Sequence, residues 1–73
     1  MTLDKLEIDK PAKIKRINAK GESVYRIMEM GLTPNTKVTV RKTAPLGDPI
    51  QIWIRGFEIT LSKSEARLIE ITS

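Results

Sequence analysis

The sequence of 73 residues contains no cysteine and no histidine. The missing cysteines exclude disulfide bonds and thiolate metal sites, and the missing histidines remove the commonest general base and the commonest transition-metal ligand. Without a histidine, none of the serines has the usual partner that would activate it as a nucleophile. We therefore expect a protein that is not an enzyme, has no cofactor and has no convincing metal site of its own.

Long apolar runs are also absent, since no stretch approaches the roughly 18 residues that cross a bilayer. The first ten residues contain acidic side chains where a secretory signal would need an uninterrupted apolar stretch. These absences predict a cytoplasmic protein that does not insert into a membrane. The length suits one small domain, which we expect to span residues 1–73.

Basic residues outnumber acidic ones, 13 to 9, and give a formal net charge of +4. A net positive charge favours an anionic partner, although a few net charges are also common in small soluble domains. A stripe of basic residues on the expected strands could follow a phosphate backbone: Lys13, Lys15, Lys37, Arg41 and Lys42. Only three aromatic side chains are present for base stacking, so nucleic-acid binding is retained as an alternative rather than the main hypothesis.

Apolar and polar residues alternate along several short segments, which is the pattern of half-buried strands. We expect strands over 12–18, 37–42 and 50–55, a fourth around Ile59 and Leu61, and a fifth around Ile69 and Ile71. The first nine residues should turn Leu3, Leu6 and Ile8 toward the core. Ile17 departs from the alternation, which indicates a bulge or a strand end. The prediction is a mainly β fold, a small barrel of five or more strands that closes to hide its edges.

Residues 22–30 change to a helical period. Val24, Ile27 and Met28 lie on one face, and Ser23 is the expected N-cap. Gly31 then ends the helix, because a left-handed residue often closes a helix. Near the end of the chain, Ser62 and Glu65 form a capping box that predicts a short helical turn.

The segment A-P-L-G-D-P-I, residues 44–50, lies between the two clearest strands. Prolines mark strand ends, and glycine and aspartate favour turns, so a hairpin connection explains each residue type in it. A phosphate-binding loop would need more glycine and a following helix. Trp53, on the polar face of the next strand, is either a cover for the barrel mouth or an interaction anchor.

Four short motifs occur in order along residues 12–72: M-G-L-x-P, A-P-x-G-D-P, G-x-x-x-x-L and E-A-x-x-I. In combination they resemble the ferrous iron transport protein A family, FeoA. One departure is Asn35, where the family usually has glycine; asparagine tolerates the same positive φ. The resemblance implies a small SH3-like β-barrel with one short α-helix and a C-terminal helical turn. It also implies an accessory protein that binds the cytosolic nucleotide-binding region of the membrane ferrous iron transporter, FeoB.

The resemblance also suggests which residues matter. The expected partner-binding residues are Arg26, Met30, Leu32, Leu46, Asp48 and Trp53. The expected structural positions are Gly31, Pro34, Pro45, Gly47, Pro49 and Gly56. Two further hypotheses are a regulatory module related to the SH3-like domain of iron-dependent repressors, and a GTPase-activating protein in which Arg26 or Arg55 stabilises a transferring phosphoryl group.

Overall fold

Five strands form one antiparallel sheet in the computed structural model, which describes residues 1–72. The strands are β1 (Pro11–Ile17), β2 (Lys37–Thr43), β3 (Ile50–Ile54), β4 (Phe57–Leu61) and β5 (Ile69–Thr72). Their order across the sheet is β4-β3-β2-β1-β5, and every neighbouring pair is antiparallel. The expected mainly β fold with five short strands is confirmed.

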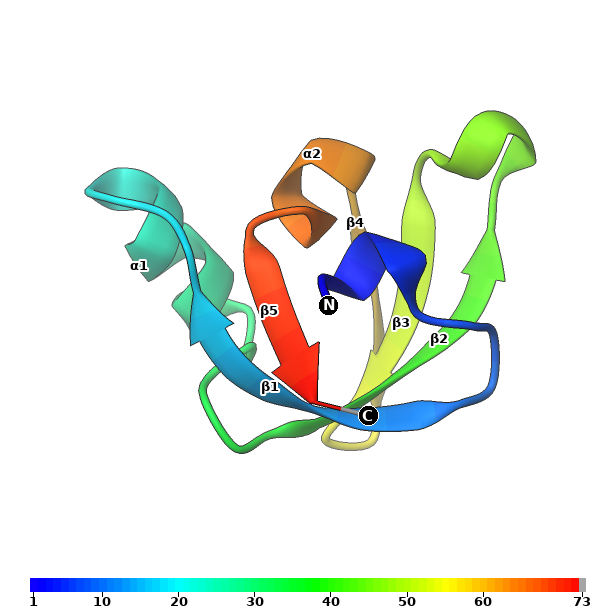
Figure 1. The fold of residues 1–73 in the computed structure, drawn as a ribbon, viewed down its shortest axis with the longest axis horizontal. Coiled ribbons are helices and arrows are strands. Elements are labelled where there is room, and N and C mark those ends of the chain that lie inside the picture. Colours follow the sequence, from blue (N-terminus) through cyan, green and yellow to red (C-terminus); the bar gives the residue numbers. More distant parts are fainter. Residues whose placement is uncertain (73) are drawn as a thin grey trace.

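The helical elements are short, and one of them precedes β1 while the others lie between strands. They are α1 (Glu22–Glu29), α2 (Lys63–Ala66) and two 3-10 turns, η1 (Leu3–Lys5) and η2 (Pro45–Gly47). Figure 1 shows α1, α2 and η2 along the same side of the molecule, above the curled sheet. The predicted helix and the predicted C-terminal helical turn are both present.

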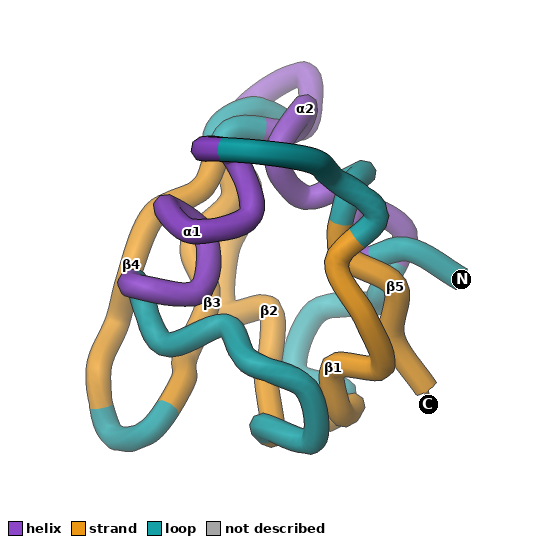
Figure 2. The backbone as a smooth tube through the Cα atoms, turned by 90° about the vertical axis from the view of Figure 1, so that its left-hand side faces the viewer, coloured by secondary structure: helices purple, strands orange, loops and turns teal. Residues whose placement is uncertain are grey.

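The sheet curls around its interior but does not close by hydrogen bonds. Register shifts between Ile14 and Arg16 and between Val40 and Lys42 mark irregularities that help to bend it. The curl is visible in Figure 2, where the strands surround the core on three sides. No pairing joins β4 to β5 among residues 1–72, so the expectation of a closed barrel is corrected. Instead, η1 packs against α2 and β5 at the opening.

The core consists of the inward side chains of every strand together with a few residues from the helices and loops. Along β1, β2 and β3 the buried residues alternate with exposed or half-buried ones, as the sequence pattern predicted. In β1 and β2 the alternation stops at the register shifts, beyond which no residue of either strand is buried. The buried apolar residues are Leu3, Leu6, Ala12, Ile14, Ile27, Leu32, Val38, Val40, Ile50, Ile52, Ile54, Leu61, Ala66, Ile69 and Ile71.

Ile8, which was expected to face the core, and Met28, on the predicted apolar face of the helix, both lie at the surface. Ile8 is 50% exposed, because its isolated parallel bridge to Val40 places it beside the sheet rather than under it. Met28 is 38% exposed. The helix buries Ile27 completely, and Met28 lies about 100° further around the helix axis.

Both ends of α1 are defined by glycine. At the C-terminal end, the Gly31 N–H donates to the Met28 carbonyl (2.9 Å) and the Leu32 N–H donates to the Ile27 carbonyl (3.4 Å). These two bonds form a Schellman motif, and Gly31 has φ +98°. This confirms the predicted helix end. The predicted N-cap was wrong: the N-cap is Gly21, without a side-chain bond, and Ser23 lies inside the first turn.

The turn between α1 and β2 also follows the prediction. Asn35 has φ +71°, and the Thr36 N–H donates to the Thr33 carbonyl (3.1 Å). Pro34 occupies the position whose φ proline presets. Asparagine therefore replaces glycine here without loss of the turn.

Candidate protein-interaction surface

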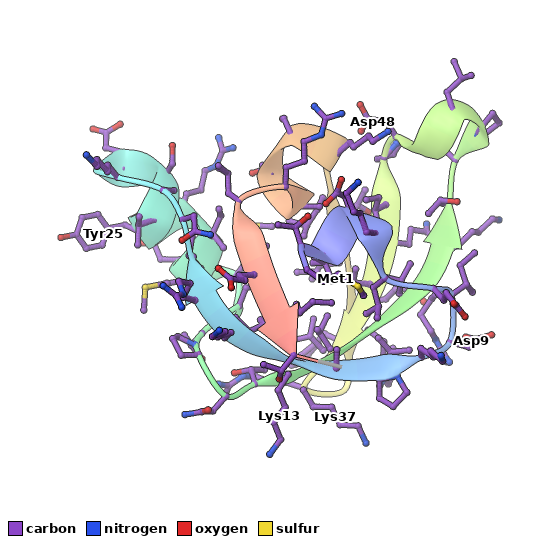
Figure 3. All side chains as sticks on the ribbon, viewed as in Figure 1. Met1, Asp9, Lys13, Tyr25, Lys37 and Asp48 are labelled. Atoms are coloured by element: carbon purple, nitrogen blue, oxygen red, sulfur yellow. The ribbon has the colours of Figure 1, made fainter. Side chains whose placement is uncertain are left out.

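Three segments that are distant in the sequence meet along one side of the curled sheet: α1, α2 and the 44–49 loop. Arg26 of α1 donates to a carboxylate oxygen of Glu65 in α2, with 2.6 Å between Nη2 and Oε2. On the other side of α2, the Lys63 N–H donates to Oδ1 of Asp48 in the loop (2.9 Å). We call these three segments the helix–loop surface. In Figure 3, Tyr25 projects from the outer side of α1, and Asp48 lies beside α2.

The capping box at the start of α2 is complete. Ser62 Oγ accepts from the Glu65 N–H (3.1 Å), and Glu65 Oε1 accepts from the Ser62 N–H (3.1 Å). The Ser62 backbone N–H, followed by the hydrogen bond from Arg26, lowers the pKa of the Glu65 carboxyl group. Glu65 therefore stays ionised and joins α1 to α2 at neutral pH.

The 44–49 loop is a hairpin connection, as predicted from its residue types. The Ala44 N–H donates to the Pro49 carbonyl (3.0 Å), and the Gly47 N–H donates to the Ala44 carbonyl (2.8 Å). Because one oxygen of Asp48 accepts from the backbone of α2, this carboxylate fixes the loop in place. Asp48 is thus at least partly a structural residue.

Leu46 is the most exposed large apolar side chain among residues 1–72, at 97%. It follows Pro45 at the third position of the turn, with φ +70° and ψ +8°. That conformation is normally occupied by glycine or asparagine, and a residue with a Cβ adopts it at a cost of about 1–2 kcal/mol. The loop therefore holds an apolar side chain in water and in an unfavourable backbone conformation. Strain of this kind is concentrated at functional positions.

The outer face of α1 adds further exposed apolar area. Tyr25 is 69% exposed and Met28 is 38% exposed, while Met30 at the end of the helix is half-buried. A hollow of about 360 Å³ on this face is lined by Glu22, Ser23, Tyr25, Arg26 and Glu29. Sequence reasoning did not select Tyr25. Its position two residues before the buried Ile27, on the opposite side of a 3.6-residue helix, was the signal that could have identified it.

Two of the six residues expected to bind a partner do not lie on this surface. Leu32 is fully buried, because it packs back under the end of α1, so it cannot contact a partner directly. Trp53 is 40% exposed but points to the outer face of β3, whereas its neighbour Ile54 is buried on the inner face. The structure therefore links Arg26 and Asp48 through α2, leaves Leu46 exposed on the same loop as Asp48, and half-buries Met30 at the end of α1.

Arg55, one of the two arginines considered for phosphoryl transfer, supports the turn after α1. Its Nη2 donates to the hydroxyl oxygens of Thr33 (3.0 Å) and Thr36 (3.1 Å). Arg26, the other arginine, is held by Glu65. Both guanidinium groups therefore have partners inside the chain.

The expected structural positions are distributed over the turns. Gly31, Gly47 and Gly56 all have positive φ. Pro34 and Pro45 occupy the second positions of their turns, and Pro49 immediately precedes β3. Within residues 1–72 there is no group of three or more Asp and Glu side chains arranged to hold a metal ion. No helix in this part of the chain is long and apolar enough to cross a membrane.

Comparisons with known proteins give a consistent result. The FeoA domain model matches residues 1–73. A Porphyromonas gingivalis protein, an Fe(2+) transport protein A/Fe(2+) transporter FeoB fusion protein, is 34% identical over 71 residues. That match covers 97% of this chain and 8% of the fusion protein.

Solved structures agree with the sequence matches. The solution structure of iron(II) transport protein A from Clostridium thermocellum has a TM-score of 0.93 and 42% identity, over 97% of this chain and 44% of that one. The crystal structure of Stenotrophomonas maltophilia FeoA complexed with zinc, described as a prokaryotic SH3 domain protein, has a TM-score of 0.85 and 22% identity. It covers 99% of this chain and 89% of its own, and at this identity it shows the SH3-like fold alone. A match of the FeoA domain model to the whole of this chain and 34% identity to a curated relative place the chain in the FeoA family.

Proposed function

We propose that this chain is a non-enzymatic, cytosolic adaptor of ferrous iron uptake that binds the nucleotide-binding region of FeoB through the helix–loop surface. The observation that carries this proposal is the P. gingivalis relative, in which the two proteins are parts of one chain. Covalent fusion keeps two domains at high effective concentration, an arrangement that suits modules that act on each other.

The helix–loop surface supports the proposal because its parts have the features of a docking site. Leu46 offers an apolar anchor on a loop that is fastened at Asp48. Exposed Arg26 and Tyr25 add the side-chain types that are enriched in energetic hot spots of protein interfaces. A rigid loop also loses little conformational freedom on binding, which favours affinity.

The first test is the affinity of this chain for the purified cytosolic region of FeoB, measured by calorimetry for wild type, Leu46→Asn and Phe57→Asn. Asparagine tolerates the positive φ of position 46, so Leu46→Asn should fold at least as stably as wild type, with a gain of up to about 1 kcal/mol. If Leu46 is a hot spot, the affinity should fall about thirtyfold or more.

Phe57→Asn is the matched control. Phe57 is also an exposed apolar side chain, at 69%, but it lies at the opposite end of β3 and β4 from the loop. Its substitution should leave the affinity within about twofold of wild type. Equal affinities for all three proteins, or no association of wild type with FeoB, would refute the proposed surface or the proposed partner, respectively.

A further inference from the structure

The outer face of the sheet carries a pair of exposed lysines at the end of β2 that is remote from the 44–49 loop. The register of β1 and β2 places Lys13 directly opposite Lys37, and both side chains are exposed. Figure 3 shows both lysines pointing away from the molecule, on the side remote from α2 and Asp48. Like charges directly opposite each other in a sheet destabilise it. The fold thus keeps an unfavourable pair in a place where an anion would relieve it.

Neighbouring residues extend this feature. Arg41 and Lys42 are exposed at the irregular part of β2, and the Arg41 guanidinium lies over the ring of Trp53, 5.3 Å from its centre. We call Lys13, Lys37, Arg41, Lys42 and Trp53 the basic face. It is not free of acidic groups, since Asp9 lies 3.9 Å from Arg41 and Glu58 pairs with Trp53 across β3 and β4.

Most other basic side chains in the described part of the chain have carboxylate partners there, whereas Lys13, Lys37 and Lys42 have none. Within residues 1–72, ion pairs involve Lys10, Lys15, Arg16, Arg26, Arg41 and Arg67. Lys13, Lys37 and Lys42 take part in none of the ion pairs formed by this part of the chain. A groove of about 390 Å³ runs between the two opposed lysines, lined by Pro11, Ala12, Lys13, Lys37 and Thr72. The positive charge is therefore available to an external anionic partner.

We propose that the basic face binds the anionic phospholipid headgroups of a membrane surface, so that the domain lies on the bilayer while its helix–loop surface holds the transporter. This inference rests on the proposed function, which places the chain beside a membrane protein. Charge complementarity supports it, and a tryptophan with an exposed edge suits the interface between water and lipid. A single ring offers no stacking platform for successive bases, which disfavours single-stranded nucleic acid.

The expected strength is low and suits an auxiliary contact. Each lysine or arginine near an anionic surface strengthens binding by about fivefold, so four give a dissociation constant of about 1 mM in accessible lipid. Contact of this strength would matter mainly when the helix–loop surface already holds the domain beside the membrane. The two contacts can form together because Lys13 and Lys37 lie at the end of β2 remote from the 44–49 loop and point away from Asp48.

The test is flotation of the isolated chain with vesicles at low salt. Vesicles made of phosphatidylglycerol and phosphatidylcholine in equal parts should carry the protein, pure phosphatidylcholine vesicles should not, and about 0.5 M salt should release it. The variant Lys13→Gln/Lys37→Gln should bind about thirtyfold more weakly. Because the substitutions remove an unfavourable charge pair, the unfolding temperature of this variant should be unchanged or slightly higher than that of wild type. That result would exclude misfolding as the cause of its weaker vesicle binding.

The matched control is Lys5→Gln/Lys20→Gln, which changes the net charge equally in η1 and just before α1, away from the basic face. Equal losses in both double variants would show that only net charge matters and would overturn the proposal. So would absence of binding to the anionic vesicles, or binding to labelled nucleic acid under conditions where the vesicles are not bound. The solution affinity for FeoB should be unchanged in Lys13→Gln/Lys37→Gln, so failure here is distinguishable from failure of the proposed function.

Discussion

Two of the four non-glycine residues with positive φ, Asn35 and Leu46, differ in how well their residue types suit this conformation. Asn35 has φ +71° at an internal turn and is a residue type that tolerates this conformation. Leu46 has nearly the same φ but is a residue type that does not, and its side chain contacts almost nothing in the chain. Asn35 is explained by the turn alone. Leu46 is explained if its side chain contacts a partner, which is why it is the central residue of the proposed surface.

Gly31 is the residue whose replacement should most directly affect the end of α1. A Cβ at this position would lie 3.5 Å from Ile54 Cδ1, an ordinary contact, so the penalty arises from the φ of +98° rather than from a clash. We expect Gly31→Val to lower the free energy of unfolding by at least about 1 kcal/mol, measured by chemical denaturation. Gly31→Asn should lose less stability than Gly31→Val, because asparagine tolerates positive φ better than valine does. Equal stability of the valine variant would show that the helix end adapts.

Glu65 should make stability dependent on pH. Its pKa in the folded chain lies below the ordinary value of 4.5, so its ionised form stabilises the fold above that pH, and this stabilisation disappears as the pH falls through the lowered pKa. The difference in unfolding free energy between wild type and Glu65→Gln should therefore be largest at neutral pH and shrink below pH 4.5. Denaturation curves across this range measure it. A difference independent of pH would contradict the ionic role.

At the scale of the elements, the strands follow almost entirely from local patterning. Alternation along β2 and β3 identifies the inward residues because a strand exposes successive side chains on opposite faces. The end of α1 could be predicted because glycine at a helix terminus has a specific conformational reason. The beginning could not, since Gly21 and Ser23 are both acceptable N-caps and the choice depends on the path of the preceding loop.

Ile52 lies at the middle of β3 with no exposed surface, so it tests the assigned core face. We expect Ile52→Ala to destabilise the fold by about 2–5 kcal/mol, through lost burial and the cavity left behind. The neighbouring variant Gln51→Ala, on the outer face of the same strand, should change stability by less than about 0.5 kcal/mol. Thermal and chemical unfolding of the two variants would give this comparison. Similar losses of stability in both variants would mean that the inner and outer faces of β3 are wrongly assigned.

At the scale of the whole molecule, the candidate site depends on contacts that local patterns do not contain. The predicted loop and helix residues are brought together through α2, by way of the Arg26–Glu65 and Asp48–Lys63 contacts. These join residues 39 and 15 positions apart, which no periodicity reveals. Burial of Leu32 and the separation of Trp53 from α1 likewise follow from the curl of the sheet. The motifs pointed to α1 and the 44–49 loop, and the tertiary structure decides which of their side chains face outward.

The two ends of the described chain lie close together in space. The Met1 carbonyl accepts from the Ile71 N–H (2.8 Å), so the two ends of the described chain leave the molecule from neighbouring points. A tether attached at either end would therefore start from nearly the same place. Such a domain can therefore be joined to a larger protein at its N-terminus, at its C-terminus or by insertion into an internal loop, and keep much the same orientation.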